Sequence, residues 1–262
     1  MKPVTSLFCK TLTSHYCRQL AFNRLYVIAK QLSTMSSSKR VNCPSENKLG
    51  ECPAFLNGDP KTVHKAIIVI QEWWGVNQQI QDCARDIAKD ANVITLVPDL
   101  YRGKVATDHE TAGHYMDDLD WGGAVGDIRG CARYLKSLGC KKVGVTGFCM
   151  GGALSMAAAA LVSEIDAVAP FYGIPGEALC DVTTIKVPLQ CHFAEKDETF
   201  GFASPAEWKP LKTKLEGSVK QLEFYIYDAG HAFNNKTGPN YNEELSKLAF
   251  SRMFDFFQKN LS

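Results

Sequence analysis

The sequence lacks the patterns that mark several common classes of protein. No apolar run among its 262 residues approaches the roughly 18 residues that a membrane-spanning helix requires. No two of the ten cysteines are spaced as C-x-x-C, and no ligand cluster supports a metalloenzyme. The formal net charge is only +1, which gives no electrostatic reason to expect nucleic acid. We therefore expect no membrane contact, no nucleic acid partner, no metal and no other cofactor.

Acidic residues are missing from the N-terminal part of the chain, where the first is Glu46. Residues 1–40 instead combine lysine and arginine with serine, threonine and scattered apolar residues, which is typical of a mitochondrial transit peptide. A disordered basic extension, or an upstream start on a product that begins at Met35, would leave the same pattern. The predicted location is therefore mitochondrial or cytosolic, with an N-terminal extension over 1–40 and one folded domain over 41–262.

The folded part alternates between buried strands and amphipathic helices. Its composition, 45% apolar and 22% charged, is ordinary for a globular domain. This alternation predicts an α/β fold with a doubly wound, mostly parallel sheet and helices on both faces. Predicted strands cover 52–56, 66–71, 93–97, 143–146, 166–171, 187–194 and 221–227. Predicted helices cover 78–90, 109–116, 123–138, 151–161, 208–216 and 243–259.

One stretch between a strand and a helix carries the strongest chemical pattern. It is the thiol version of the Gly-x-Ser-x-Gly nucleophile elbow, with the sequence Gly147-Phe148-Cys149-Met150-Gly151-Gly152. The glycines remove Cβ atoms that would collide where strand and helix pass close together. The helix N-terminus also points its N–H groups at the sulfur, which favours thiolate. Most free cysteines are small buried apolar residues, but this setting favours a nucleophile at Cys149.

Residues that follow other strands can complete an acyl-transfer site. Asp197 and His231 come after Cys149 in the order nucleophile, acid, base that α/β-hydrolases follow. Glu195 and Glu198 compete with Asp197 for the acid, whereas His192 lies inside a predicted strand and is expected to be structural. The predicted oxyanion donors are the backbone N–H groups of Met150 and Trp73. Because the backbone N–H groups would bind the oxyanion, the identities of these two side chains neither support nor oppose the prediction.

Glu72 directly follows a buried strand and precedes two tryptophans. A carboxylate there would be partly desolvated, which raises its pKa, and it could hydrogen-bond a neutral Cys149 thiol. A salt-bridged structural carboxylate is the alternative. The same edge of the sheet gathers candidate substrate-binding residues, which are Arg102, Trp74, Tyr101, Trp121 and Tyr172.

Taken together, these motifs resemble the dienelactone hydrolase (carboxymethylenebutenolidase) family of the α/β-hydrolase superfamily. The resemblance covers about 41–261 and includes Gln71-Glu72-Trp73-Trp74-Gly75, Pro98-Asp99-Leu100-Tyr101-Arg102, the elbow, Phe171-Tyr172-Gly173 and Ala229-Gly230-His231-Ala232-Phe233. It implies a Cys149–Asp197–His231 triad, with Glu72 holding the thiol until substrate binds.

The resemblance also implies two arginines that hold a substrate carboxylate. Arg102 corresponds to one of them, but Asn234-Asn235-Lys236 stands where the other is expected. Asn cannot replace a bidentate arginine and Lys does so only in part, which puts dienelactone itself in doubt as a substrate. An acidic ester or lactone stays open as a substrate, held by Arg102 and Lys236.

We therefore expect a cofactor-free, cysteine-dependent hydrolase that acts on small esters or lactones through a covalent acyl-thioester, and we expect a monomer. The alternative from another class is a ligand-binding or redox-sensing protein on this scaffold with little turnover. The complete triad argues against that alternative, while the missing second arginine and the oxidisable thiol support it.

Overall fold

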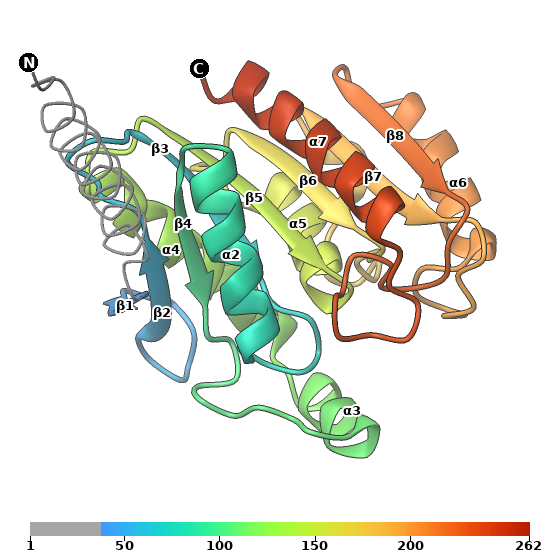
Figure 1. Ribbon diagram of the computed structural model, residues 1–262, viewed down its shortest axis with the longest axis horizontal. Helices are drawn as coiled ribbons and strands as arrows, with labels where there is room; N and C mark the ends of the chain where they lie inside the picture. Colours follow the sequence, from blue (N-terminus) through green and yellow to red (C-terminus); the bar gives the residue numbers. More distant parts are fainter. Residues whose placement is uncertain (1–37) are drawn as a thin grey trace, which may run out of the picture. The chain divides into compact units, whose positions relative to one another are not determined.

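The computed structural model describes residues 38–262 (Figure 1). Residues 1–37 of the predicted N-terminal extension therefore lie outside the described residues. The first strand, β1 (Lys39–Cys43), pairs antiparallel with β2 (Cys52–Asn57), and Lys39 faces Leu56 in the register. Strand pairing thus reaches two residues further toward the N-terminus than the boundary that we predicted at position 41.

An eight-stranded sheet forms the centre of the domain, in the order β1-β2-β4-β3-β5-β6-β7-β8. The pairs that involve β1 and β2 are antiparallel, and every other neighbouring pair is parallel, so the predicted mostly parallel sheet is confirmed. Because parallel strands share one carboxyl edge, the segments that follow them meet there. The parallel strands are β3 (Lys65–Ile70), β4 (Ile94–Pro98), β5 (Lys142–Phe148), β6 (Ala167–Phe171), β7 (Leu189–Ala194) and β8 (Leu222–Tyr227).

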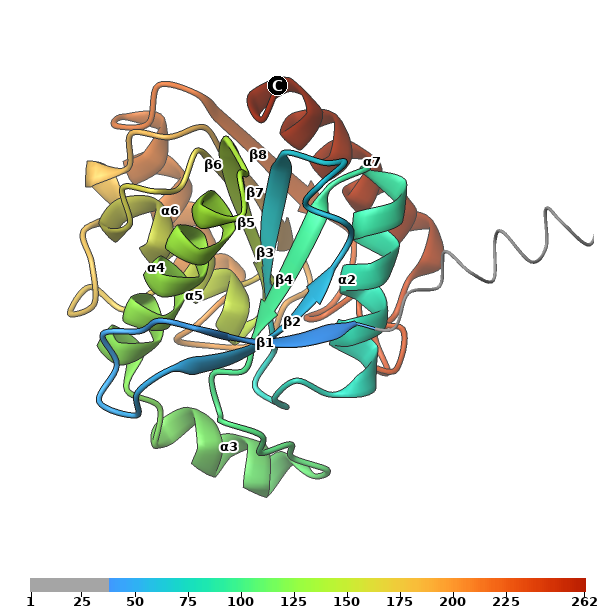
Figure 2. The ribbon, with the colours of Figure 1, turned by 90° about the vertical axis from the view of Figure 1, so that its left-hand side faces the viewer.

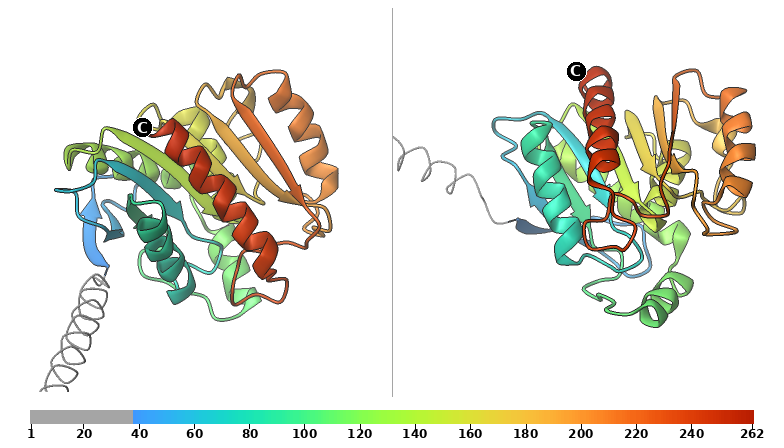
Figure 3. Two further views of the ribbon diagram at one scale, coloured as in Figure 1. Left: turned by 45° about the horizontal axis from the view of Figure 1, so that its top comes forward. Right: turned by 45° about the vertical axis from the view of Figure 1, so that its right-hand side comes forward.

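Helices cover both faces of the sheet, as the predicted fold class requires (Figure 2). One face carries α4 (Trp121–Ser137), α5 (Met150–Leu161) and α6 (Pro205–Glu216). The other face carries α2 (Gln78–Asp90) and α7 (Glu243–Asn260), which Figure 3 shows on the same side of the strands. Each face buries its own apolar cluster, and alternate residues of the central strands enter each cluster, with Ile68 on one side and Ile67 on the other.

All the predicted strands and helices are present. Two observed helices begin earlier than predicted because of their capping residues. The helix predicted from 208 begins at Pro205, because the Ser204 side chain accepts the Ala206 N–H and proline suits the first turn. The helix predicted from 123 begins at Trp121, since Asp120 caps it by accepting the Gly123 N–H. Two elements were not predicted: β1 and the short 3₁₀ helix η1 (Val182–Thr184).

The connection after β4 contains α3 (His109–Asp117), which Figure 1 shows beyond the carboxyl ends of the strands. Asp108 caps this helix by accepting the Thr111 N–H.

No helix within 38–262 is long and apolar enough to cross a membrane.

Candidate active site

Cys149 occupies the turn between β5 and α5, where the sequence predicted an elbow. Its backbone lies at φ 55° and ψ −117°, a region that non-glycine residues rarely adopt. Strain of this kind costs on the order of 1–3 kcal/mol and persists only where the surrounding structure enforces it. The thiol is half-buried rather than enclosed, so the turn presents it at the carboxyl edge of the sheet.

Two glycines after Cys149 allow α5 to lie directly against the strands. A Cβ atom on Gly151 would lie 2.5 Å from the carbonyl oxygens of Ile70 and Gln71. A Cβ atom on Gly152 would lie 2.1 Å from the carbonyl oxygen of Phe171. No side chain fits at either position, so the two glycines set how closely the elbow approaches β3 and β6.

Asp197 and His231 come from the loops that follow β7 and β8, and the structure brings them together. His231 Nδ1 donates to Asp197 Oδ2 at 2.7 Å. Asp197 is 2% exposed, and its other oxygen accepts the backbone N–H of Thr199 at 2.9 Å. A buried carboxylate with both oxygens engaged holds the imidazole in one orientation and directs Nε2 away from the aspartate.

The surroundings of His231 favour a protonated ring. Burial alone lowers its pKa, but the hydrogen bond to Asp197 and the nearby Cys149 sulfur outweigh burial and raise the pKa to about 10. Nε2 is buried and has no hydrogen-bond partner of normal geometry within residues 38–262. The Cys149 sulfur therefore lies close enough to raise the pKa of the ring, without a hydrogen bond of normal geometry to it.

Glu72 lies at the end of β3 and is 4% exposed. Its Oε2 accepts the side-chain N–H of Asn235 at 2.6 Å, whereas Oε1 is buried with no hydrogen-bond partner in the described part of the chain. Desolvation raises the pKa of Glu72, and the charge of His231 and the contacts of Asn235 and Tyr172 only partly offset it. The Tyr172 hydroxyl is close but also lacks a hydrogen bond of normal geometry, and burial and the Glu72 charge raise its pKa.

We expect Glu72→Gln to stabilise the protein at pH 7, by about 1–3 kcal/mol, because it removes a buried, half-paired charge. The glutamine keeps an acceptor for Asn235 and gains a donor for Tyr172. Since the folded pKa of Glu72 is raised, the carboxylate weakens stability above that pKa, and the penalty disappears below the unfolded pKa, near 4.5. Urea unfolding between pH 4 and 8 measures this difference.

The exposed Glu195→Gln is the matched control for that measurement, because Glu195 lies at the same edge of the sheet but in solvent. It should leave the pH dependence of stability unchanged. A Glu72→Gln variant that is less stable than the wild type at every pH would show that the carboxylate is better satisfied than its contacts indicate.

The Arg102 side chain is engaged within the protein. Its Nη1 and Nη2 atoms donate to the two oxygens of buried Asp127 at 2.9 and 2.8 Å. The same two nitrogens also donate to the carbonyl oxygens of Asp99 and Gly50. These bonds use the Nη1 and Nη2 donors that would otherwise hold a substrate carboxylate. The predicted role of Arg102 in binding substrate stays a prediction.

Replacing Arg102 with alanine should destabilise the protein by about 3 kcal/mol, because it leaves Asp127 buried without its cation. Adding Asp127→Asn to this variant should restore part of the loss. Arg129→Ala, which removes an exposed ion pair with Glu46, should cost less than about 1 kcal/mol. Denaturant unfolding measures all three variants, and a loss of similar size in Arg102→Ala and Arg129→Ala would contradict the expectation.

Aromatic side chains surround the elbow in two groups. The Tyr101 hydroxyl donates to Met150 Sδ at 3.1 Å, and its ring packs edge-on against Tyr115. Trp73 and Trp74 pack edge-on against one another and against His109, with ring centroids 5.1 to 5.5 Å apart. Trp121 begins α4 and packs against the same apolar cluster as Trp73. The predicted roles of these aromatic residues in binding substrate stay predictions.

The predicted backbone donors occupy suitable places in the chain. Met150 is the first residue of α5, and the first N–H groups of a helix have no acceptor within that helix. Trp73 directly follows Glu72 in the loop after β3. The oxyanion role of both residues stays a prediction.

Tyr172 is fully buried and packs edge-on against His231, with ring centroids 5.1 Å apart. Its backbone lies at φ 36°, and four non-glycine residues in the segments after the parallel strands have positive φ: Arg102, Cys149, Tyr172 and Ala232. His192, expected to be structural, is fully buried in β7. It bonds Tyr227 and Gln190 through its two ring nitrogens and stacks on Phe171.

Three residues beside the site were not singled out from the sequence. Asn235 was noted only as a departure from an expected arginine, yet it is the hydrogen-bond donor to Glu72. His109 packs against both tryptophans, and Phe202 lies edge-on to His231. None of the three carried a local signal in the sequence, and the partner of Asn235 lies 163 positions away. Lys236, considered as a partial substitute for the arginine, pairs with Asp86 of α2.

A comparison with protein families matches residues 53–261 to the model of the dienelactone hydrolase family. Among curated sequences, the chain is 33% identical over 218 residues to "Protein usf" of Aquifex pyrophilus, covering 78% of this chain and 91% of that protein. It is 28% identical over 216 residues to the carboxymethylenebutenolidase of Pseudomonas putida, covering 78% and 89%.

Solved structures agree on the fold. A dienelactone hydrolase-like promiscuous phosphotriesterase from metagenomic libraries superposes with a TM-score of 0.68 at 16% identity, covering 86% of this chain and 99% of that one. An esterase of Pyrococcus furiosus superposes with a TM-score of 0.65 at 15% identity, covering 88% and 95%.

Proposed function

Because the chain belongs to the dienelactone hydrolase family, we propose that it hydrolyses carboxylic esters or lactones with Cys149 as the nucleophile. The observation that carries this proposal is the strained elbow that presents the thiol beside a histidine bonded to Asp197 at 2.7 Å. A nucleophile, a base and an orienting carboxylate are the three groups that acyl transfer requires.

In the first half of the reaction, the Cys149 sulfur attacks the carbonyl carbon of the ester and a C–S bond forms. The carbonyl oxygen takes the negative charge, which the N–H groups of Met150 and Trp73 would stabilise. The tetrahedral intermediate then breaks its C–O bond, and His231 donates its proton to the departing alkoxide. The products of this half are an alcohol and an acyl-thioester on Cys149; from a lactone, the alcohol stays attached to the acyl group.

In the second half, neutral His231 accepts a proton from water as the oxygen attacks the thioester carbon. The C–S bond breaks, a carboxylic acid leaves, and the thiolate–imidazolium pair is restored. Asp197 keeps the ring in one tautomer throughout and does not itself become protonated. A thiolate is a good leaving group, so the enzyme suits substrates that acylate readily, such as enol esters and lactones, better than amides.

Glu72 is placed to control the resting state. Its unpartnered Oε1 and raised pKa suit a group that holds the Cys149 thiol neutral before substrate binds. When substrate binds, the thiol proton passes to His231, which forms the thiolate–imidazolium pair from which the first half of the reaction starts. Asn235 holds the other oxygen in place. Glu72 would then affect how easily the thiol ionises, whereas the bond-making steps use Cys149 and His231.

The charges around the site favour substrates without a free carboxylate. Asn235 replaces the expected arginine and is used by Glu72, and Arg102 is paired with Asp127. The nearby Lys236 is paired with Asp86. A carboxylate-bearing lactone would therefore meet no unpaired cation among these three positions, and uncharged esters or lactones are the proposed substrates.

Trapping the acyl-enzyme tests the proposal. Mixing the protein with p-nitrophenyl acetate should give a burst of p-nitrophenol. After acid quench, intact mass spectrometry should find one acetyl group per chain, and peptide mapping should place it on the peptide that contains Cys149. A Cys180→Ala variant, which removes a different buried thiol, should give the same burst. Acetylation of another residue with turnover intact would reject Cys149 as the nucleophile.

A further inference from the structure

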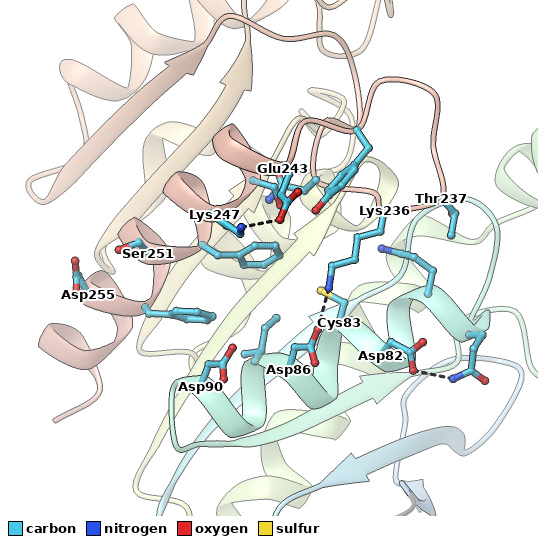
Figure 4. Close-up of a pocket in the computed structure, with 18 of the residues that line it drawn as sticks. Asp82, Cys83, Asp86, Asp90, Lys236, Thr237, Glu243, Lys247, Ser251 and Asp255 are labelled. Carbon is cyan, nitrogen blue, oxygen red and sulfur yellow. Dashed lines mark hydrogen bonds and ion pairs between the residues drawn. The ribbon is translucent and has the colours of Figure 1, made fainter. Parts of the chain in front are cut away.

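A separate cavity of about 700 Å³ lies between α2 and α7, on the face of the sheet that these helices cover (Figure 4). We name it the α2–α7 cavity. Its lining includes residues of both helices and of the loop after β8, but neither Cys149 nor His231. The volume lies within the range of sites for small organic molecules.

Asn234 lines the α2–α7 cavity and has an unsatisfied side chain. It is 4% exposed, and both its Oδ1 and its Nδ2 lack a hydrogen-bond partner within the described residues. The adjacent Asn235, by contrast, uses both ends of its amide. A buried amide without partners costs about 1–3 kcal/mol, so it points to a ligand that supplies both a donor and an acceptor.

The charges in the cavity leave two carboxylates without a cation. Lys236 pairs with Asp86, and Lys247 pairs with Glu243, so these four charges compensate one another. Asp90 of α2 and Asp255 of α7 form no ion pair among residues 38–262. Figure 4 shows both of them at the end of the cavity away from Thr237. That end would attract a positive charge.

The middle of the cavity is apolar. Ile87 of α2 contributes a buried side chain, and Phe250 and Phe254 of α7 contribute two half-buried rings whose centroids lie 6.0 Å apart. Aromatic faces bind both hydrocarbon and organic cations. Phe233, next to Asn234, accepts the backbone N–H of Asn242, which caps α7, so Asn234 lies near the start of that helix and Asp255 near its other end. The cavity therefore runs from a carboxylate end, across an aromatic floor, toward the unsatisfied amide.

From this arrangement we propose that the α2–α7 cavity binds an elongated organic ammonium compound with an apolar body. Its ammonium group lies at the end of the cavity that carries the exposed Asp90 and Asp255, its apolar body lies on Phe250 and Phe254, and an amide at its other end bonds Asn234. This site is distinct from the hydrolytic site, and the proposal does not depend on the hydrolase reaction.

Calorimetric titration of the full 262-residue chain with N-(6-aminohexyl)benzamide tests the site. We expect one site per chain, and at least about tenfold weaker binding of N-(6-hydroxyhexyl)benzamide, which differs only in lacking the charge. Cys149→Ala should bind the amine as the wild type does, which separates this cavity from the active site. Equal binding of amine and alcohol, or no binding of the amine at millimolar concentration, would overturn the proposal.

Two variants locate the binding. Asp90→Asn with Asp255→Asn should weaken the amine about fivefold. The control Glu216→Gln with Glu244→Gln, which removes the same charge outside the cavity, should leave the affinity unchanged. Asn234→Leu should weaken the amine without lowering the free energy of unfolding, because no hydrogen bond within the protein is lost. Unchanged affinity in the aspartate variant, or marked destabilisation by Asn234→Leu, would count against the site.

Discussion

Replacing Cys149 with alanine should reduce kcat/KM for p-nitrophenyl acetate and for simple lactones by at least about 10³-fold. The alanine retains the elbow but cannot form the acyl-thioester. It also relieves no backbone strain, because φ near 55° is as unfavourable for alanine as for cysteine. The fold should therefore be retained, and steady-state kinetics with matched circular dichroism measures the loss.

Comparing His231→Ala, Cys149→Ala and the double variant shows whether the imidazole and the thiol act as a unit or contribute independently to the rate. If thiol and imidazole act as a unit, the double variant should be little worse than either single variant. Equal activity of the wild type and both single variants would reject an enzyme of this mechanism. It would then favour the ligand-binding or redox-sensing alternative that the oxidisable thiol supports.

Asp197→Asn should reduce kcat by about 10⁴-fold while leaving KM and stability nearly unchanged. The asparagine can occupy the same space, but its amide N–H group would face Nδ1 and favour the wrong tautomer of His231. Loss of the carboxylate also removes the hydrogen bond that, together with the nearby Cys149 sulfur, raises the pKa of His231 to about 10, so that pKa should fall. Kinetics and an NMR titration of the imidazole measure the two effects.

Asp228→Asn is the matched control, because Asp228 precedes His231 by three residues but is exposed and pairs with Lys196. It should leave kcat and the imidazole pKa unchanged. A similar loss in both variants would mean that Asp197 acts through the general negative charge of the loop. A loss confined to KM would place Asp197 in substrate binding.

The fold was largely predictable because local pattern and packing agree. The predicted limits of α2 match the observed ones, since Asn77 caps its N-terminus and Ile80, Ala84 and Ile87 form a regular buried stripe. β1 was missed because its exposed Lys39 and Arg40 resemble the basic segment before them, and only pairing with β2 makes a strand of them. Tertiary pairing of this kind leaves no periodic signal in the strand itself.

The site was predictable where a residue type has a fixed place in the chain. The elbow, the acid and the base each follow a strand, so topology alone brings them to one edge of the sheet. The partners of charged residues were not predictable. Nothing near Arg102 in the sequence indicates that Asp127, 25 positions away, takes both ends of its guanidinium. Asn235 and Glu72 are separated by 163 positions, and only the folded chain reveals their hydrogen bond.

The place of β8 at the edge of the sheet has a consequence during synthesis on the ribosome. The elbow and its thiol emerge well before His231, which follows the last strand. The nascent thiol has no imidazole beside it until β8 pairs with β7 and delivers the loop that carries the histidine. If Cys149 and His231 act as proposed, the order of translation brings the two together only after β8 has been made.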